Sequence, residues 1–225
     1  MWLLIDPMYL LFAVPGLLLG LWAQAYVKSS FAKYSKIRAR SGFTGRDAAR
    51  TVLRSGELTD VRVEPIPGSL TDHFDPRSKI IRLSEPVYDA DSIAALGIAA
   101  HEAGHALQHD AGYIPAAIRS AIVPVASLGS GAAMPLFFVG LIFHFQALQL
   151  FGIFLFAGVA VFQLVTLPVE FDASRRALRA LASSGALAED ELPGARKVLT
   201  AAALTYIAAL LQVLLTLLYM ISRRR

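Results

Sequence analysis

Four long apolar runs dominate the pattern of the chain, and polar residues gather in a few stretches between them. The runs cover residues 3–27, 122–143, 148–167 and 198–221. A helix needs about 20 apolar residues to cross a bilayer, so each run predicts a membrane-spanning helix. The second and third runs are joined by a few residues that carry no formal charge if His144 is neutral, which predicts a tight helical hairpin.

The first run is expected to be a retained membrane anchor rather than a cleaved signal peptide. It carries Asp6 where a signal peptide has a basic region, and it is longer than the apolar core of such a peptide. Pro7 and Pro15 are compatible with this interpretation, because prolines are tolerated in membrane helices. The run is therefore predicted to start outside the cell and to end in the cytoplasm.

The polar stretch after the first run begins with a predicted short helix over residues 42–56. Thr44 is its expected N-cap and Asp47, three residues on, its capping-box partner. Gly56 stands where the helix should stop.

Two predicted strands and a longer helix follow. The strands cover residues 61–68 and 78–84, and the turn between them covers residues 69–77. The first strand contains Pro and is closed by Gly, which favours the edge of a sheet. Residues 91–110 predict a helix whose cap is Ser92 or the residue before it.

The composition is typical of a membrane protein, and it excludes several kinds of cysteine chemistry. The chain of 225 residues is 56% hydrophobic and carries a formal net charge of +4. It has no cysteine, so disulfides, thiolate metal sites and cysteine nucleophiles are excluded, and any metal must be held by His, Asp or Glu.

The positive charge follows the membrane pattern, because basic residues come directly after the first and third runs. These residues are Lys28, Lys33, Lys36, Arg38, Arg40, Arg175, Arg176 and Arg179. The positive-inside rule then places both segments in the cytoplasm, and no nucleic-acid partner is expected. Three terminal arginines at residues 223–225 oppose this orientation, since four crossings would put both ends outside. The alternative is that the last run does not cross fully.

Candidate chemistry lies in the helix over residues 91–110. His101, Glu102 and His105 form a His-Glu-x-x-His motif, in which the two imidazoles share one helix face about 6 Å apart. This spacing is typical of a zinc site in which the Glu acts as a base toward an activated water molecule. Gly104 lowers helix propensity by roughly 1 kcal/mol relative to Ala, which predicts close approach by a neighbouring element.

A catalytic zinc site needs a third protein ligand, and Glu170 is the first candidate. It follows the third run, which returns to the membrane face of the motif helix. Asp172 on the same segment is an alternative. His109 is disfavoured as a ligand, because it lies about 12 Å from His101 along a straight helix.

The turn before the second strand offers further polar groups. Asp72 and His73 are explained by a surface turn, or they fold back over the metal site, where His73 would stabilise an oxyanion. The strand over residues 78–84 is expected to be an exposed edge that takes a substrate peptide as an added strand. The substrate-binding residues expected there are Lys79, Ile80, Ile81, Arg82 and Leu83.

With these motifs, the sequence resembles the YugP-like family of neutral zinc metallopeptidases, which are multi-pass bacterial membrane proteins. The likeness rests on LTDHFDPRSKIIRLSE, SIAALGIAAHEAGHALQH and LPVEFDASRRA. The resemblance implies a gluzincin-type site with His101, His105 and Glu170 as ligands and Glu102 as general base. It also implies one catalytic zinc ion.

A more distant likeness concerns the residues around the ligands. EFDAS is similar to the Glu-x-x-x-Asp segment of membrane CAAX-type proteases, where the Asp steadies a ligand histidine. Ser174 stands at that position here. The orienting carboxylate is then expected from Asp72 or Asp172, or it is missing. His109 is expected beside the site or at a solvated helix end.

The sequence thus predicts a mainly α, multi-pass membrane protein with a small cytoplasmic zincin-like α+β portion, including a short β-hairpin before the motif helix. Its expected function is zinc-dependent cleavage of a peptide or membrane-protein substrate at the cytoplasmic face of the bacterial plasma membrane. A non-catalytic zinc-binding scaffold or adaptor is the alternative, and a homo-oligomer or a regulatory membrane partner is left open. The predicted segments are 1–27 (anchor), 28–120 (zincin-like portion), 121–168 (hairpin), 169–197 (third-ligand helix and linker) and 198–225 (last membrane helix).

Overall fold

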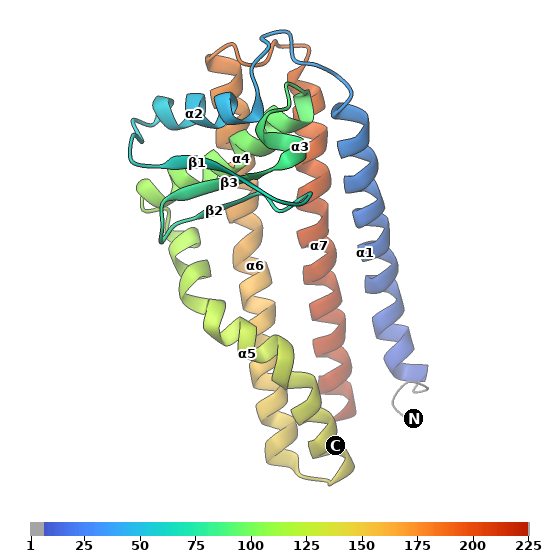
Figure 1. Cartoon of the computed structure of the whole chain (residues 1–225). Coiled ribbons are helices and arrows are strands. Elements are labelled where there is room, and N and C mark those ends of the chain that lie inside the picture. The colour runs from blue at the N-terminus through green and yellow to red at the C-terminus, as the bar shows by residue number, and fades with distance from the viewer. Residues whose placement is uncertain (1–6, 225) are drawn as a thin grey trace. The chain divides into compact units, whose positions relative to one another are not determined.

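The structure, a computed structural model, describes residues 7–224 (Figure 1). Asp6 and the last arginine therefore lie outside the described residues. The protein is mainly helical with one small sheet, which confirms the predicted fold class. The elements are α1 (Pro7–Tyr34), α2 (Gly45–Ser55), β1 (Arg62–Ile66), β2 (His73–Asp75), β3 (Ile80–Ser84), α3 (Glu85–Tyr88), α4 (Ile93–Asp110), α5 (Ile114–Ile142), α6 (Gln146–Ser183) and α7 (Leu192–Arg223).

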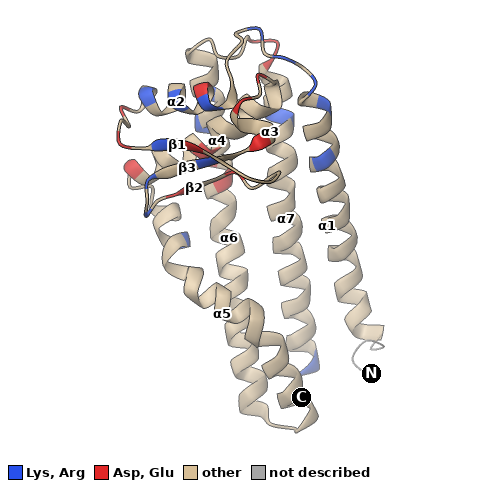
Figure 2. Ribbon diagram, viewed as in Figure 1, with Lys and Arg blue, Asp and Glu red and all other residues tan. Residues whose placement is uncertain are grey.

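Four helices, α1, α5, α6 and α7, are long and apolar enough to cross a membrane. They cover most of each of the four apolar runs, as far as residues 7–224 show, and each extends beyond its run into polar residues. Figure 2 shows few charged residues along most of the length of these helices, and more of them on α2, the sheet, α4, the connecting loops and the ends of the long helices. This separation is what a bilayer requires, because charged groups are costly in its hydrocarbon core.

The chain divides into two compact units. The first comprises Met1–Gln24, Pro115–Pro168 and Leu204–Arg225, and the second comprises Ala25–Ile114 and Val169–Ala203. The first unit therefore holds most of the apolar helical length. The second holds α2, the sheet, α3, α4 and the polar end of α6.

In the first unit, α5 and α6 form the predicted tight hairpin. Only residues 143–145 separate the two helices, and His144 turns the chain with φ 53°. Glycines let the two backbones approach closely. A Cβ at Gly129 would lie 2.6 Å from the carbonyl oxygen of Leu155, and one at Gly152 would lie 2.7 Å from that of Ala133.

In the second unit, α2 and α4 begin as their sequences predict. The side chain of Thr44 caps α2 and forms a capping box with Asp47, and the helix ends at Gly56. Ser92 caps α4, its hydroxyl accepting a hydrogen bond from the Ala95 amide. The two helices bury small and aliphatic side chains, including Ala48, Val52, Leu96, Ala99 and Ala103.

The sheet differs from the prediction in two ways. Its strand order is β1-β3-β2, with β1 parallel and β2 antiparallel to β3. The segment taken as a turn thus contains β2, which forms the hairpin with β3. A three-residue strand between polar residues is too short to show an alternating pattern, so pairing with β3 defines it.

The expectation that residues 78–84 form an exposed edge is wrong, because β3 is the central strand. Its backbone pairs with β1 on one side and, through Ile80, Ile81 and Arg82, with β2 on the other. The side chains of Ile80, Ile81 and Leu83 are buried in the protein. Lys79 forms an ion pair with Asp60.

The third apolar run does not end its helix at Pro168. Helix α6 continues through this proline to Ser183. Proline removes one helical hydrogen bond, and membrane helices tolerate this loss. As a result Glu170, Asp172 and Ser174 lie on the same continuous helix as the third apolar run, rather than on a separate helix after it.

Candidate metal centre

Helix α4 presents both histidines of the motif on one face. The ring centroids of His101 and His105 lie 4.7 Å apart with their planes at 82°. Their side chains are mostly buried, with 14% and 16% of their surface exposed. One helix alone therefore provides two nitrogen ligands at a spacing that a single ion can bridge.

Close packing of α6 against α4 brings a carboxylate next to the two histidines. A Cβ at Gly104 would lie 2.6 Å from the carbonyl oxygen of Ala173, so only glycine allows the two backbones this contact. The close approach expected from the sequence at Gly104 is confirmed. The neighbouring element is α6, and its contact with Gly104 brings Glu170 beside the histidines.

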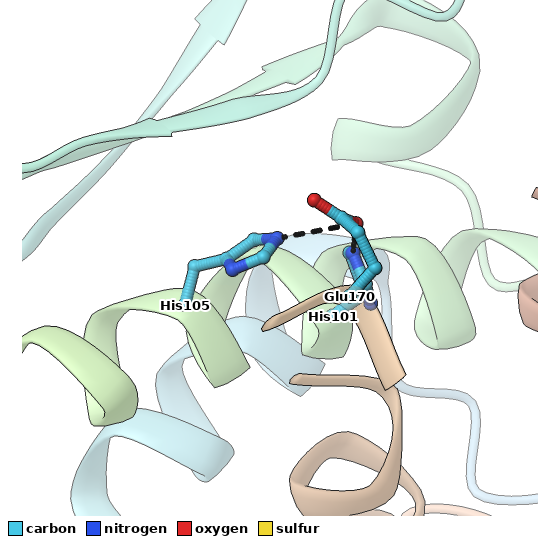
Figure 3. Close-up of side chains that lie close together, drawn as sticks. All are labelled: His101, His105 and Glu170. Atoms are coloured by element: carbon cyan, nitrogen blue, oxygen red, sulfur yellow. Dashed lines mark hydrogen bonds and ion pairs between the residues drawn. The ribbon is translucent and has the colours of Figure 1, made fainter. Parts of the chain in front are cut away.

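The carboxylate of Glu170 lies beside both rings, and dashed lines join it to each of them (Figure 3). Its Oε2 is 3.2 Å from Nε2 of His101 and 3.7 Å from Nε2 of His105. Candidate ligand atoms of all three residues lie within 4.8 Å of one another, and Glu170 is only 3% exposed. The structure thus brings together the three residues that the sequence nominated, across a separation of 69 positions.

The two alternative ligands lie elsewhere. The Asp172 carboxylate accepts hydrogen bonds from Gln108 and from Arg176, the latter at 2.6 Å. The His109 ring packs edge-on against Phe74 of β2, with centroids 6.0 Å apart. Among the described residues, the grouped metal-binding side chains are His101, His105 and Glu170.

The electrostatics of the group favour a cation. Burial alone would lower the pKa of His105, but the hydrogen bond that the protonated ring donates to Glu170 and the negative charge of Glu102 outweigh it, so this pKa is raised. A raised histidine pKa means that the surroundings of His105 stabilise a positive charge. Two imidazole nitrogens and one carboxylate are a ligand set that zinc takes in catalytic sites, with a fourth position left for water. The donor set therefore fits zinc.

The outer nitrogen of each ring has its own partner. Nδ1 of His101 lies 3.1 Å from the Ser174 hydroxyl, and Nδ1 of His105 lies 3.1 Å from Oε1 of Gln108. The resemblance had directed attention to Ser174, but Gln108 was missed. Its signal in the sequence is the spacing His-x-x-Gln, which puts the amide one helical turn after the second ligand.

Asp72 and His73 do not hold the rings. The Asp72 carboxylate accepts hydrogen bonds from the Ser84 amide, at 2.7 Å, and from its hydroxyl. Burial, together with the charge of Glu102, raises the pKa of Asp72, so this carboxyl lies within electrostatic range of the motif. Both Nδ1 atoms already have other partners, so Asp72 is not the group that orients them.

His73 faces away from α4. Side chains alternate along a strand, and Phe74 is the neighbour that contacts His109 on α4. Nδ1 of His73 lies 2.8 Å from the Thr71 carbonyl oxygen, and its Nε2 lies 3.4 Å from Arg82. This geometry gives no support to His73 as an oxyanion donor.

Comparison with known proteins points to the same chemistry. Residues 9–225 match the model of a family described as "putative neutral zinc metallopeptidase". The chain is 48% identical over 211 residues to a Bacillus subtilis (strain 168) protein named "Putative membrane protease YugP", and the alignment covers 94% of each chain. No solved structure matches the chain.

Proposed function

The chain belongs to the neutral zinc metallopeptidase family whose model it matches, and from this premise we propose that it is a membrane zinc endopeptidase. His101, His105 and Glu170 would hold the ion, and Glu102 would act as general base. The observation that carries the proposal is the convergence of two imidazoles from α4 and one buried carboxylate from α6.

The ion, when bound, supplies Lewis-acid polarisation of the scissile carbonyl and activation of water. Glu102 directly follows the first proposed ligand, and its negative charge contributes to raising the pKa of both His105 and Asp72, which supports a position near the proposed site. There its carboxylate would take a proton from the attacking water and later give it to the leaving amine. Ser174 and Gln108 would keep the two imidazoles turned toward the ion.

The number of protein ligands favours an enzyme over a non-catalytic zinc scaffold. Structural zinc sites are closed by four protein ligands, whereas catalytic sites use three. The metal-binding group within residues 7–224 has three members. A structural site would also have no use for a base at Glu102.

The substrate is proposed to be a peptide segment or a membrane protein that reaches the cytoplasmic face. Basic residues after α1 and on the polar part of α6 support this orientation. Since β3 is central, the free edge beside α4 belongs to β2. An extended peptide would therefore pair with β2 rather than with residues 79–83.

The direct test is Glu102→Gln in the purified full-length chain. We expect this variant to bind one zinc ion per chain but to lose at least about 100-fold of its activity, the usual contribution of a positioned base. The probe is a peptide library whose cleavage is followed by mass spectrometry. Glu189→Gln, in the exposed link before α7, is the matched control and should cleave like the parent. If Glu102→Gln cleaves as well as the parent does, the proposed mechanism is wrong.

A further inference from the structure

We infer that Gln108 is a positioning residue that sets the protonation pattern of His105 and its place relative to Glu170. This inference rests on the proposed zinc site. Gln108 is 1% exposed and lies on α4, three residues after His105. Its side chain contacts one ligand histidine and the backbone beside the third ligand.

The orientation of the Gln108 amide follows from its neighbours. Nε2 lies 2.8 Å from the carbonyl oxygen of Val169 and 3.0 Å from Oδ2 of Asp172. Both of these atoms are acceptors, so the amide nitrogen must face them. The amide oxygen therefore faces Nδ1 of His105, 3.1 Å away.

This orientation decides which nitrogen of His105 carries the proton. An amide oxygen can only accept, so Nδ1 of His105 must be the donor. The neutral ring then has its lone pair on Nε2, the atom that lies 3.7 Å from the Glu170 carboxylate. Gln108 thus fixes the tautomer that metal binding requires.

An ion pair between Arg176 and Asp172 holds the Gln108 amide in place. Arg176 donates to Asp172 over 2.6 Å, and its guanidinium lies 5.8 Å from the centre of the Tyr113 ring. Asp172 is therefore kept as an acceptor for Gln108. This gives Asp172 a role as a support for the amide rather than as a ligand.

Ser174 does not determine the tautomer of His101 in the same way. A serine hydroxyl can donate or accept, so its 3.1 Å contact with Nδ1 is compatible with either tautomer of the ring. Gln108 also binds the carbonyl of Val169, the residue before Glu170. One buried side chain thereby links the ring of His105 to the backbone that carries the third ligand.

The test compares zinc affinity in two leucine variants. Gln108→Leu removes the acceptor at similar volume and should weaken zinc binding by about 10- to 100-fold, the usual effect of losing such a partner. Gln149→Leu is the matched control. Gln149 is also a buried glutamine, 2% exposed, and donates to a backbone carbonyl, that of Gly140 in the α5–α6 hairpin. Its loss should leave zinc affinity unchanged.

Two further variants separate the acceptor from simple packing. Gln108→Glu keeps an acceptor for Nδ1, but alone it would set a second carboxylate beside Asp172, which lies 3.0 Å from the Gln108 amide nitrogen. It is therefore made together with Asp172→Asn, and this double variant should bind zinc at least about ten times more tightly than Gln108→Leu combined with Asp172→Asn. Gln108→Asn is one methylene shorter and should weaken binding in the same direction as leucine. It serves as the test if Gln108→Leu does not give a folded chain by circular dichroism.

The measurement is competition for Zn²⁺ with a fluorescent chelator, in detergent, on the full-length chain. If the parent binds zinc and Gln108→Leu binds it equally well, the role of Gln108 is refuted while the proposed function stands. If the glutamate and leucine variants that carry Asp172→Asn are equally weak, Gln108 is a packing residue and the inference is also refuted. If the parent itself does not bind one zinc ion per chain, the proposed function fails first.

Discussion

Gly104 controls how closely α4 and α6 approach at the metal centre. A Cβ there would lie 2.6 Å from the Ala173 carbonyl oxygen, and a backbone atom cannot move aside as a side chain can. We expect Gly104→Ala to lower the free energy of unfolding by about 1–3 kcal/mol through overpacking, despite the better helix propensity of alanine. It should also weaken zinc binding, because the clash moves Glu170 away from the rings.

Chemical denaturation and zinc titration on the same sample check both effects. Gly131→Ala in α5 is the control, since nothing lies within 4 Å of its Cβ position. That variant should keep the stability and the zinc affinity of the parent. If Gly104→Ala behaves like Gly131→Ala, the close contact does not set the geometry of the site.

At the scale of residues, the sequence predicted the grouping of the three candidate ligands better than the side chains that contact them. His101 and His105 belong to one helix, so their spacing alone fixes their geometry. Glu170 could be nominated because the third run returns to the same membrane face. Gln108 was missed because its partners are on α6, and no local pattern shows which α6 atoms lie beside it.

The capping box makes α2 the element whose stability should depend on acid pH. Asp47 accepts hydrogen bonds from the hydroxyl and the amide of Thr44, and the hydroxyl contact lowers the pKa of Asp47. A carboxyl whose pKa is lowered by folding stabilises the protein above its unfolded pKa. This stabilisation is lost as the pH falls through the lower, folded value, which means below about pH 4.

We therefore expect Thr44→Ala to cost about 1 kcal/mol at neutral pH, within the range of 0.5–2 kcal/mol for lost caps. The difference between parent and variant should shrink as the pH falls below about 4. Unfolding curves from pH 7 to pH 3 measure this. Arg54→Ala, an exposed change in the last turn of the same helix, should show no such pH-dependent difference. A constant difference for Thr44→Ala across the range would contradict the role of Asp47.

At the scale of elements, the long and periodic segments were predictable and the short ones were not. The four membrane-type helices, α2, α4 and the strands β1 and β3 follow from apolar runs, caps and β-branched residues. The strand β2 and the one-turn helix α3 depend on tertiary contacts, because three or four residues carry no clear period. For the same reason the parallel pairing of β1 with β3 could not be inferred, and residues 78–84 were expected at an edge of the sheet although β3 is its central strand.

For the whole molecule, the metal should be a source of stability because its ligands come from two helices. A ligand that binds only the folded state stabilises it by about 4.1 kcal/mol when present at 1,000 times its Kd. We expect a chelator to lower the Tm of the parent and to have little effect on Glu170→Gln. Thermal unfolding in detergent with zinc or with chelator measures this, and Glu189→Gln should respond like the parent. An unchanged parent Tm would contradict a metal link between α4 and α6.

The orientation of the protein in the membrane can be tested by labelling single introduced cysteines, because the chain itself contains none. Basic residues follow α1 and occupy the polar part of α6, whereas the α5–α6 link has no formal charge if His144 is neutral. The positive-inside rule then puts the β1–β2 loop in the cytoplasm and the α5–α6 link outside. An impermeant maleimide should label Phe143→Cys in intact cells but label Ser69→Cys only after permeabilisation. Ser222→Cys, near the end of α7, tests whether the last helix crosses fully. The reverse pattern for the first two positions would place the metal centre outside the cell and exclude cytoplasmic substrates.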